Sequence, residues 1–364
     1  MVAADSAADS AMMMRALFHA ARGQGRTTPN PMVGAIVVSP DGIVRGHGWH
    51  SRAGEPHAEV HALNDAGVGA RDSTLYVNLE PCCHVGRTGP CTDRIIAAGV
   101  ARVVAAMKDP DPRVSGRGFD TLRAHGIVVE EGMCQSDATR LNAAFVAVKT
   151  QGRPLVVMKA ATSLDARVAE APGRRTQLTS PPANRKAQVL RASVDAIAVG
   201  SETILVDDPV LTVRECQRVR PLARVVFDRR LRTPPTARVF STLSEGPVII
   251  LTGPKSGPTA DRAAALEASG AIVLEAATLA EGLRALLAWD ISTLLLEGGP
   301  RLQTAFCEAR LVDRVHLIIA PRVLGPTGVA WVGTETFSLE SVSRLVAEAR
   351  GPDTWIEADV HGHC

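Results

Sequence analysis

Three short stretches decide the fold of the first part of this chain: His57-Ala58-Glu59, Pro81-Cys82 and Pro90-Cys91. One imidazole and two thiols are ligands that zinc prefers, and three protein ligands leave one coordination position for water. A structural zinc site takes four protein ligands, so this set predicts a catalytic metal. Glu59 lies two residues after His57, where a carboxylate can take up and return a proton beside the metal. The pattern therefore predicts both a metal and a reaction.

Two neighbouring residues compete for the metal. Cys83 adjoins Cys82, and because adjacent side chains rarely point at the same ion, we interpret it as a neighbour. His61 follows His57 by four residues, as in zinc proteases, but the glutamate is the third residue of the motif instead of the second. If Cys83 or His84 were a fourth ligand, the domain would be a zinc-stabilised binding module without catalysis. That alternative stays open.

Length and composition narrow the class of protein. The 364 residues are enough for two domains. A net charge of +2 and an aromatic content of 3% argue against nucleic acid and anionic membranes as partners. No apolar run reaches the ~18–20 residues that span a bilayer, and the first ten residues do not resemble a signal peptide. Seven cysteines, three of them close together, indicate metal binding in a reducing cytoplasm.

Hydrophobic periodicity predicts a three-layer α/β domain in the first part of the chain. The expected helices are 11–22, a segment that begins at 57, 91–99, 118–125 and 141–149. The expected strands are 33–38, 43–44, 74–79, 102–107 and 127–129. Gln151-Gly152-Arg153-Pro154 then interrupts the pattern. We therefore expect one domain over residues 1–150 and a second over 151–364.

A second alternation of strands and helices follows the break. The expected strands are 155–160, 196–199, 224–227, 248–251, 271–274, 293–296 and 315–319. The expected helices are 183–192, 259–268, 279–288 and 301–309. The glycine fingerprint of a Rossmann domain does not occur after any of these strands. The second domain is thus expected to be α/β but not a Rossmann fold.

The first domain resembles the bifunctional deaminase–reductases of riboflavin biosynthesis, the RibD family. The matching stretches are Thr28-Pro29-Asn30-Pro31-Met32-Val33-Gly34, His50, Gly54-Glu55-Pro56-His57-Ala58-Glu59-Val60 and Leu79-Glu80-Pro81-Cys82-Cys83-His84-Val85-Gly86-Arg87-Thr88-Gly89-Pro90-Cys91-Thr92-Asp93. The long loop between the two cysteines is specific to this group. The resemblance implies a cytidine-deaminase-like fold in which His57, Cys82 and Cys91 bind Zn²⁺ and Glu59 is catalytic. It also implies that the pyrimidine substrate is held by Asn30, His50, His84 and Arg87.

The second domain carries further matches to the same family. They include Lys159-Ala160-Ala161-Thr162-Ser163-Leu164-Asp165, Leu190-Arg191, Asp207-Asp208-Pro209, Leu211-Thr212-Val213-Arg214 and Leu296-Glu297-Gly298-Gly299-Pro300. The resemblance implies a dihydrofolate-reductase-like fold that uses NADPH. The implied substrate contacts are Arg175, Arg191, Leu211, Arg214 and Glu297. The implied cofactor contacts are Ala161, Gln177, Thr203, Asp207, Gly299, Pro300, Arg301 and Leu302.

The resemblance therefore implies a two-step enzyme that acts on a small molecule and forms a homo-oligomer. The first step is hydrolytic deamination of 2,5-diamino-6-ribosylamino-4(3H)-pyrimidinone 5′-phosphate. The second is NADPH-dependent reduction of the ribosyl chain to ribityl. Three residues depart from the family pattern in the reductase half: Ala166 replaces a glycine, Arg175 a small hydroxyl residue and Gln177 a tryptophan. An alternative follows from these departures, namely a deaminase whose second domain is only structural.

Overall fold

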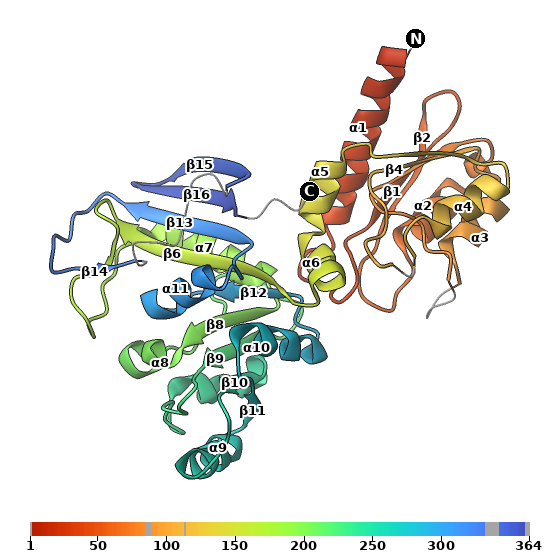
Figure 1. The fold of residues 1–364 in the computed structure, drawn as a ribbon. Helices are drawn as coiled ribbons and strands as arrows, with labels where there is room; N and C mark the ends of the chain where they lie inside the picture. Colours follow the sequence, from red (N-terminus) through yellow and green to blue (C-terminus); the bar gives the residue numbers. More distant parts are fainter. Residues whose placement is uncertain (1, 85–88, 113, 332–341, 361–364) are drawn as a thin grey trace. The chain divides into compact units, whose positions relative to one another are not determined.

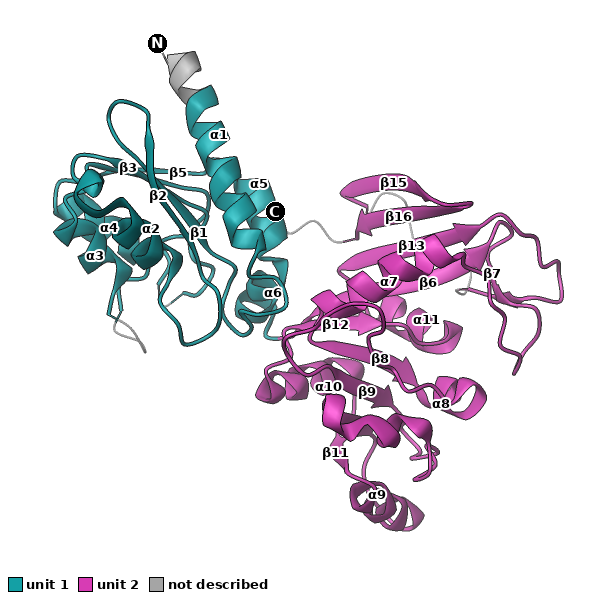
Figure 2. Cartoon of the chain, turned by 180° about the vertical axis from the view of Figure 1, so that it is seen from behind, with its two compact units in different colours: residues 1–152 teal, residues 153–364 magenta. Residues whose placement is uncertain are grey.

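The structure is a computed structural model that describes residues 2–84, 89–112, 114–331 and 342–360. The chain divides into two compact units, Met1–Gly152 and Arg153–Cys364 (Figure 2). Each unit has its own sheet, and each is described by itself. Among the described residues, no helix combines the length and the apolar character that crossing a membrane requires.

The first unit is built on a five-stranded sheet with the strand order β2-β1-β3-β4-β5. Its strands are β1 (Gly34–Val38), β2 (Val44–Trp49), β3 (Thr74–Val77), β4 (Arg102–Ala105) and β5 (Val128–Glu131). Strand β1 pairs antiparallel with β2 and β3, whereas β3, β4 and β5 run parallel. The aliphatic runs of β1, β3 and β4 are almost wholly buried, as central strands covered on both faces must be.

Helices cover both faces of this sheet, so the expected three-layer α/β architecture is confirmed. Figure 1 shows α2, α3 and α4 together on one face and α1 with α5 on the other. The helices are α1 (Val2–Ala21), α2 (Ala58–Ala66), η1 (Gly67–Ala70), α3 (Cys91–Ala97), α4 (Arg117–Ala124), α5 (Gln135–Leu141) and α6 (Ala143–Gln151). A Cβ atom at Gly48 would lie 2.4 Å from the Ala58 carbonyl oxygen, so glycine lets the start of α2 pack directly on β2.

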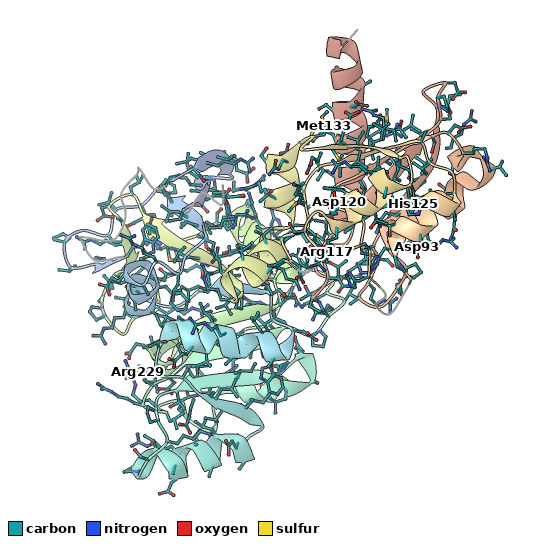
Figure 3. All side chains as sticks on the ribbon, turned by 45° about the vertical axis from the view of Figure 1, so that its right-hand side comes forward. Asp93, Arg117, Asp120, His125, Met133 and Arg229 are labelled. Atoms are coloured by element: carbon teal, nitrogen blue, oxygen red, sulfur yellow. The ribbon has the colours of Figure 1, made fainter. Side chains whose placement is uncertain are left out.

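Exposed polar side chains cover the outer surface of the helical layer. Figure 3 labels Asp93 of α3, Asp120 of α4 and His125, which follows α4; all three are exposed. The opposite, buried faces of these helices carry Ile95, Phe119 and Leu122. This division between a polar and an apolar face is what fixes each helix on the sheet.

Two expected helices of this unit differ from the structure. The first begins at Val2 and not near residue 11, because its alanine-rich start is itself a strong helix former. The helix expected over 141–149 is α6, which begins at Ala143, and a further helix that was not expected, α5, ends at Leu141 just before Asn142. The Asn142 side chain is buried and bonds both the backbone N–H and the carbonyl of Met32. That pairing ties Asn142 to the segment before β1 and interrupts the helix.

The second unit has a nine-stranded sheet with the order β11-β10-β9-β8-β12-β6-β13-β16-β15. The strands are β6 (Leu155–Ser163), β8 (Ala196–Gly200), β9 (Ala223–Phe227), β10 (Val248–Thr252), β11 (Ala271–Glu275), β12 (Thr293–Leu296), β13 (Arg314–Ala320), β15 (Arg344–Arg350) and β16 (Asp353–Asp359). All neighbours are parallel except β13–β16 and β16–β15. A small antiparallel pair joins β7 (Arg167–Ala169) to β14 (Val329–Ala330).

Helices lie on both faces of this second sheet as well. They are α7 (Pro181–Ser193), α8 (Ser201–Asp207), η2 (Arg238–Glu245), α9 (Pro258–Ala268), α10 (Leu279–Leu286), η3 (Leu287–Trp289) and α11 (Pro300–Glu308). Helix α7 places Ala183 and Ala187 against Ile318 and Trp355. Helices α10 and α11 contribute apolar side chains to the larger core cluster, which also contains residues of the parallel strands. The expected strands are all present, which confirms the α/β class of this unit.

The sequence did not indicate the hairpin β15–β16 or the helix α8. Strand β15 is exposed along most of its length and carries three charged residues in seven. It therefore lacks the alternation of apolar and polar residues that predicts a half-buried strand. Helix α8 has only seven residues, too few for a clear helical period.

A buried ion pair ties the start of this unit to its core. The Arg153 guanidinium donates to both Asp313 carboxylate oxygens at 2.7 and 2.8 Å, and the Val156 N–H donates to the same carboxylate. We expect Asp313→Asn to lower the free energy of unfolding of this unit by about 3–5 kcal/mol, because it leaves a buried cation without its counter-charge. Urea unfolding followed by tryptophan fluorescence measures the loss.

Asp359→Asn is the matched control, since Asp359 pairs with Arg314 at the same 2.7 Å but its side chain is 21% exposed. Its loss of stability should be clearly smaller. Equal losses in the two variants would show that burial of the Arg153–Asp313 pair is not what matters.

Candidate active sites

Three predicted metal ligands come together at one end of the first sheet. The ligand atoms of His57, Cys82 and Cys91 all lie within 4.8 Å of one another. The His57 Nδ1 atom is 3.3 Å from the Cys91 sulfur and 3.5 Å from the Cys82 sulfur. Among the described residues, this is the only group of three or more such side chains close enough to hold a metal ion. Two thiols and one imidazole fit a tetrahedral zinc site with one position left for water.

Each ligand is placed by the end of a secondary-structure element. His57 is the residue that precedes α2, and Cys91 is the first residue of α3. Cys82 follows β3 by five residues, and its sulfur accepts the backbone N–H of Cys91 at 3.4 Å. Hydrogen bonds from the Cys91 thiol and from His57 lower the pKa of the Cys82 thiol. Cys82 is thus held ready as a thiolate.

Glu59 lies in the first turn of α2 and is 3% exposed. Its Oε2 atom is buried and has no hydrogen-bond partner among the described residues. Burial raises the pKa of Glu59 to about 7, and the charge of Cys82 adds to the rise. An unpartnered buried carboxylate is costly, so this oxygen indicates a place where a substrate or water binds. A group with such a pKa can act as an acid and as a base near neutral pH.

Two predicted substrate residues are paired next to the metal ligands. The His50 Nδ1 atom lies 3.2 Å from the Pro56 carbonyl, which can only accept, so Nδ1 carries the proton. The other ring nitrogen then accepts from the Asn30 amide at 3.1 Å. Burial lowers the pKa of His50, which favours this neutral form. The His50 ring stands edge-on to that of His57, with the ring centroids 5.4 Å apart.

The remaining residues predicted for this site are placed less closely. His84 is exposed, two residues after Cys82. Arg87 lies outside the described residues. Cys83 is half-buried, and its thiol does not belong to the cluster of three ligands. His61 is half-buried on α2. The geometry therefore groups His57, Cys82, Cys91 and Glu59 with Asn30 and His50.

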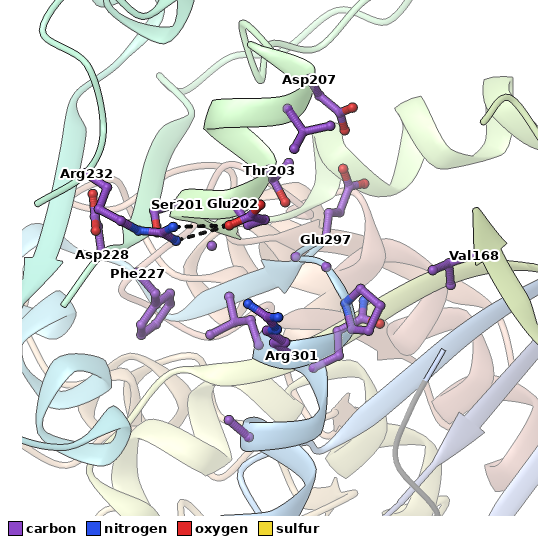
Figure 4. Close-up of a pocket in the computed structure, with 18 of the residues that line it drawn as sticks. Val168, Ser201, Glu202, Thr203, Asp207, Phe227, Asp228, Arg232, Glu297 and Arg301 are labelled. Atoms are coloured by element: carbon purple, nitrogen blue, oxygen red, sulfur yellow. Dashed lines mark hydrogen bonds and ion pairs between the residues drawn. The ribbon is translucent and has the colours of Figure 1, made fainter. Parts of the chain in front are cut away.

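The second unit contains a cavity of about 990 Å³ at the carboxyl ends of its parallel strands, where ligands bind in open α/β sheets. Figure 4 shows Thr203, Asp207 and Glu297 toward one end and Phe227, Asp228 and Arg232 toward the other. The predicted residues that line it are Ala161, Arg175, Thr203, Asp207, Glu297, Gly299, Pro300, Arg301 and Leu302. The fold thus gathers most of the predicted reductase residues around one space.

Glu297 is the central charge of this cavity. Its side chain is 6% exposed and accepts hydrogen bonds from Arg191, while the Lys159 Nζ atom lies 3.8 Å away. Burial by itself would raise the pKa of Glu297, but Lys159 and Arg191 outweigh it and lower the pKa to about 2. Glu297 is therefore a fixed anion at neutral pH, beside an ammonium group that also lines the cavity.

Four predicted residues lie outside the cavity lining. The Arg191 guanidinium is directed to Glu297 and to the Thr212 carbonyl. Gln177 is exposed and donates to Thr179. Leu211 is buried in the core, and Arg214 is exposed. Arg191 thus acts on the cavity through Glu297, and the other three do not reach it in this structure.

Several lining residues had no role in the sequence-based prediction. Lys159 stood within a quoted motif, but its ion pair with Glu297 joins positions far apart in sequence. Asp228 directly follows β9, and Thr252 is the last residue of the neighbouring strand β10. Both residues are 1% exposed, and each has a side-chain oxygen without a partner among the described residues. Gln303 lines the cavity and accepts from the Trp331 indole N–H at 2.7 Å. A polar residue directly after a buried strand is the signal that could have indicated Asp228.

Comparison with known proteins agrees with this division into two sites. Residues 6–107 match the family model described as cytidine and deoxycytidylate deaminase zinc-binding region. Residues 154–354 match the model of the RibD C-terminal domain. Each matched segment contains one of the two candidate sites.

Full-length relatives cover both units at once. The riboflavin biosynthesis protein RibD of Escherichia coli (strain K12) is 42% identical over 331 residues, which is 87% of this chain and 89% of the relative. The protein of the same name from Aquifex aeolicus is 41% identical over 319 residues, 87% of this chain and 88% of the relative. Acinetobacter baumannii RibD superposes with a TM-score of 0.85 at 34% identity, over 98% of this chain and 100% of that structure.

A solved structure from Thermotoga maritima is also similar, with a TM-score of 0.84 and 30% identity over 98% of this chain and 99% of that one. It is described as a diaminohydroxyphosphoribosylaminopyrimidine deaminase/5-amino-6-(5-phosphoribosylamino)uracil reductase. The fold of both units, cytidine-deaminase-like and dihydrofolate-reductase-like, is therefore confirmed.

The three-ligand geometry predicts how cysteine variants differ in metal content. We expect Cys91→Ser to lose most of its zinc, because a hydroxyl is a much poorer ligand than a thiolate. Cys83→Ser should keep one zinc ion per chain, because Cys83 is outside the cluster. Elemental analysis of the purified proteins measures this. Loss of zinc from Cys83→Ser would support the closed, four-ligand alternative.

Proposed function

The chain belongs to the RibD family, whose members join a deaminase to a reductase, and we propose that it catalyses two successive steps of riboflavin biosynthesis. The first is hydrolytic deamination of 2,5-diamino-6-ribosylamino-4(3H)-pyrimidinone 5′-phosphate. The second is reduction of the ribosyl chain of the deaminated product to ribityl with NADPH. The name given to the similar Thermotoga maritima protein supports this pair of substrates.

The observation that carries the first step is the buried Glu59 Oε2 atom, which has no hydrogen-bond partner among the described residues and whose carboxylate interacts with Cys82 and His57. When bound by His57, Cys82 and Cys91, zinc would supply a Lewis acid that makes water a nucleophile at neutral pH. Glu59 would take one proton of the attacking water and deliver it to the pyrimidine ring nitrogen. It would then take the second proton, from the oxygen added to the ring carbon, and give it to the departing amino group, so that one water is consumed and one ammonia leaves. Asn30 and His50 are placed to bind the edge of the ring.

The cavity of the second unit supports the reductase step. NADPH bound in this cavity would supply a hydride to C1′ of the ring-opened sugar, and solvent would supply the proton that balances it. The protein contributes orientation: Glu297 accepts from sugar hydroxyls, and Lys159 beside it provides a donor. One observation favours a working reductase over a structural second domain: Lys159 and Arg191 keep the buried Glu297 carboxylate ionised. The alternative, a deaminase only, rests on the departures at Arg175, which lines the cavity, and at Gln177, which does not.

The far end of this cavity supports NADPH as the cofactor. Asp228 and Thr252 line this end, and each has a buried side-chain oxygen without a partner among the described residues, which fits the hydroxyl groups of a ribose. Arg229 and Arg230 are exposed beside them and line the same end, and Figure 3 shows Arg229 at the outer edge of its unit. Guanidinium groups bind phosphate strongly. A ribose with a 2′-phosphate, as in NADPH, matches both features.

Glu59→Gln tests the deaminase mechanism. The amide keeps the shape of the side chain but cannot carry the proton, so ammonia release should fall by about 10²–10⁴-fold. NADPH oxidation with the already deaminated intermediate should stay near the wild-type rate, because that reaction belongs to the other unit. Both are measured on the full chain. Unchanged ammonia release would exclude Glu59 as the proton carrier.

Nucleotide fragments test the cofactor end without any turnover. Arg229→Ala and Arg230→Ala should each weaken binding of 2′,5′-ADP, and together by roughly 10- to 100-fold, as expected for lost hydrogen bonds to a charged group. Binding of 5′-ADP should change little, since it lacks the 2′-phosphate. Titration calorimetry gives both constants. Arg238→Ala, an exposed arginine outside the cavity lining, is the control; an equal effect there would point to net charge alone.

A further inference from the structure

Glu80 lies two residues before the ligand Cys82 and is 3% exposed. Its carboxylate accepts three backbone N–H groups, from Gly118 at 2.8 Å, Gly116 at 2.9 Å and Asp109 at 3.1 Å. Its own N–H donates to the Met107 carbonyl at 2.9 Å. A buried carboxylate with three backbone donors is strongly fixed, so the turn that carries Cys82 is anchored at its start.

Two of these donors belong to the beginning of α4. Gly116 precedes this helix and Gly118 is its second residue, where backbone N–H groups lack partners within the helix. The approach is close, because a Cβ atom at Gly118 would lie 2.1 Å from the Pro81 carbonyl oxygen. Figure 3 labels Arg117 between the two glycines. The start of α4 is therefore pressed against the ligand turn.

Cys82 is held from its other side by the start of α3. The Thr92 N–H donates to the Cys82 carbonyl at 3.2 Å, and the Cys91 N–H donates to the Cys82 sulfur. These contacts alone leave the chain before Cys82 unconstrained. Glu80 constrains this part of the chain, through donors that are 29 to 38 residues away in sequence.

We infer that Glu80 is a positioning residue for the metal ligand Cys82, and that its three backbone contacts set how tightly the deaminase centre holds its metal. The inference rests on the proposed deaminase, because Cys82 must bind a metal. Groups that orient a ligand without touching the metal typically change metal affinity by about 10–100-fold. Glu80 acts through the direction of the Cys82 thiolate and makes no contact with substrate.

Glu80→Gln in the full chain tests this role. A glutamine has one carbonyl oxygen, and its amide hydrogens face backbone N–H groups, so at least one of the three contacts is lost. With Co²⁺ as the metal, we expect a changed thiolate–cobalt absorption spectrum. We also expect about 10–100-fold faster release of the metal to an excess of chelator.

Asp195→Asn is the matched control. Asp195 is a buried carboxylate in the other unit that accepts the backbone N–H groups of Ser292 and Thr293 and pairs with Arg220 at 2.7 Å. Its variant weakens these contacts but should keep the wild-type cobalt spectrum and release rate. If it changed them as much as Glu80→Gln does, general destabilisation would explain the effect, and the inference would be wrong.

Gly118→Ala is a second, independent variant. It keeps Glu80 but pushes a methyl group against the Pro81 carbonyl, so it should also alter the spectrum and speed release. If Glu80→Gln fails to fold, Gly118→Ala tests the inference in its place. Wild-type spectra and release rates in the folded variants would overturn the inference. Failure of the wild-type chain to bind cobalt would instead contradict the proposed deaminase itself.

Discussion

Crowding of negative charge around one point is the constraint on which the first unit depends. Two cysteine sulfurs and a buried carboxylate lie within one small volume, with a single imidazole between them. Without a cation, such a group is unfavourable, because like charges repel and desolvation penalises each of them. A Zn²⁺ ion held by His57, Cys82 and Cys91 would remove that penalty and would join α2, α3 and the turn after β3. Burial, with the charge of Cys82 as a smaller cause, raises the pKa of Glu59 to about 7.

The second unit contains a buried anion, Glu297, that remains charged. Glu297 keeps its charge because Arg191 and Lys159 approach it from α7 and β6. Arg191 supports the carboxylate from behind, whereas Lys159 shares the cavity with it. The two units therefore differ in their central carboxylate: the pKa of Glu59 is raised to about 7, whereas Glu297 stays ionised at neutral pH.

The sequence predicted which three ligand residues the fold brings together, because these residues occupy ends of elements that local patterns reveal. His57 precedes a helix, Cys91 begins one, and prolines precede both cysteines. Contacts between distant segments could not be predicted. The donors to Glu80, the Arg191–Glu297 pair and the Trp331–Gln303 bond depend on how elements pack. Local sequence shows a residue's type and element, but it does not show its partner in space.

The same limit explains why only some of the residues predicted for the reductase half line the cavity. Residues within the glycine turn before α11 line the cavity as expected, since a turn after a buried strand has few alternatives. Gln177 and Arg214 lie in irregular segments, and there a motif match does not fix the direction of a side chain. Asp228 and Thr252 were missed because their unpartnered oxygens become evident only once burial and hydrogen bonding are known.

A single assay with the purified full chain tests the central claim, that one chain links a hydrolytic and a reductive site. The diaminopyrimidine phosphate is supplied with and without NADPH, and ammonia and NADPH absorbance are followed together. The account predicts ammonia release in both cases, and NADPH oxidation that lags behind it and reaches the same amount. Ammonia release without any NADPH oxidation would contradict the reductase, and NADPH oxidation without ammonia would contradict the order of the two steps.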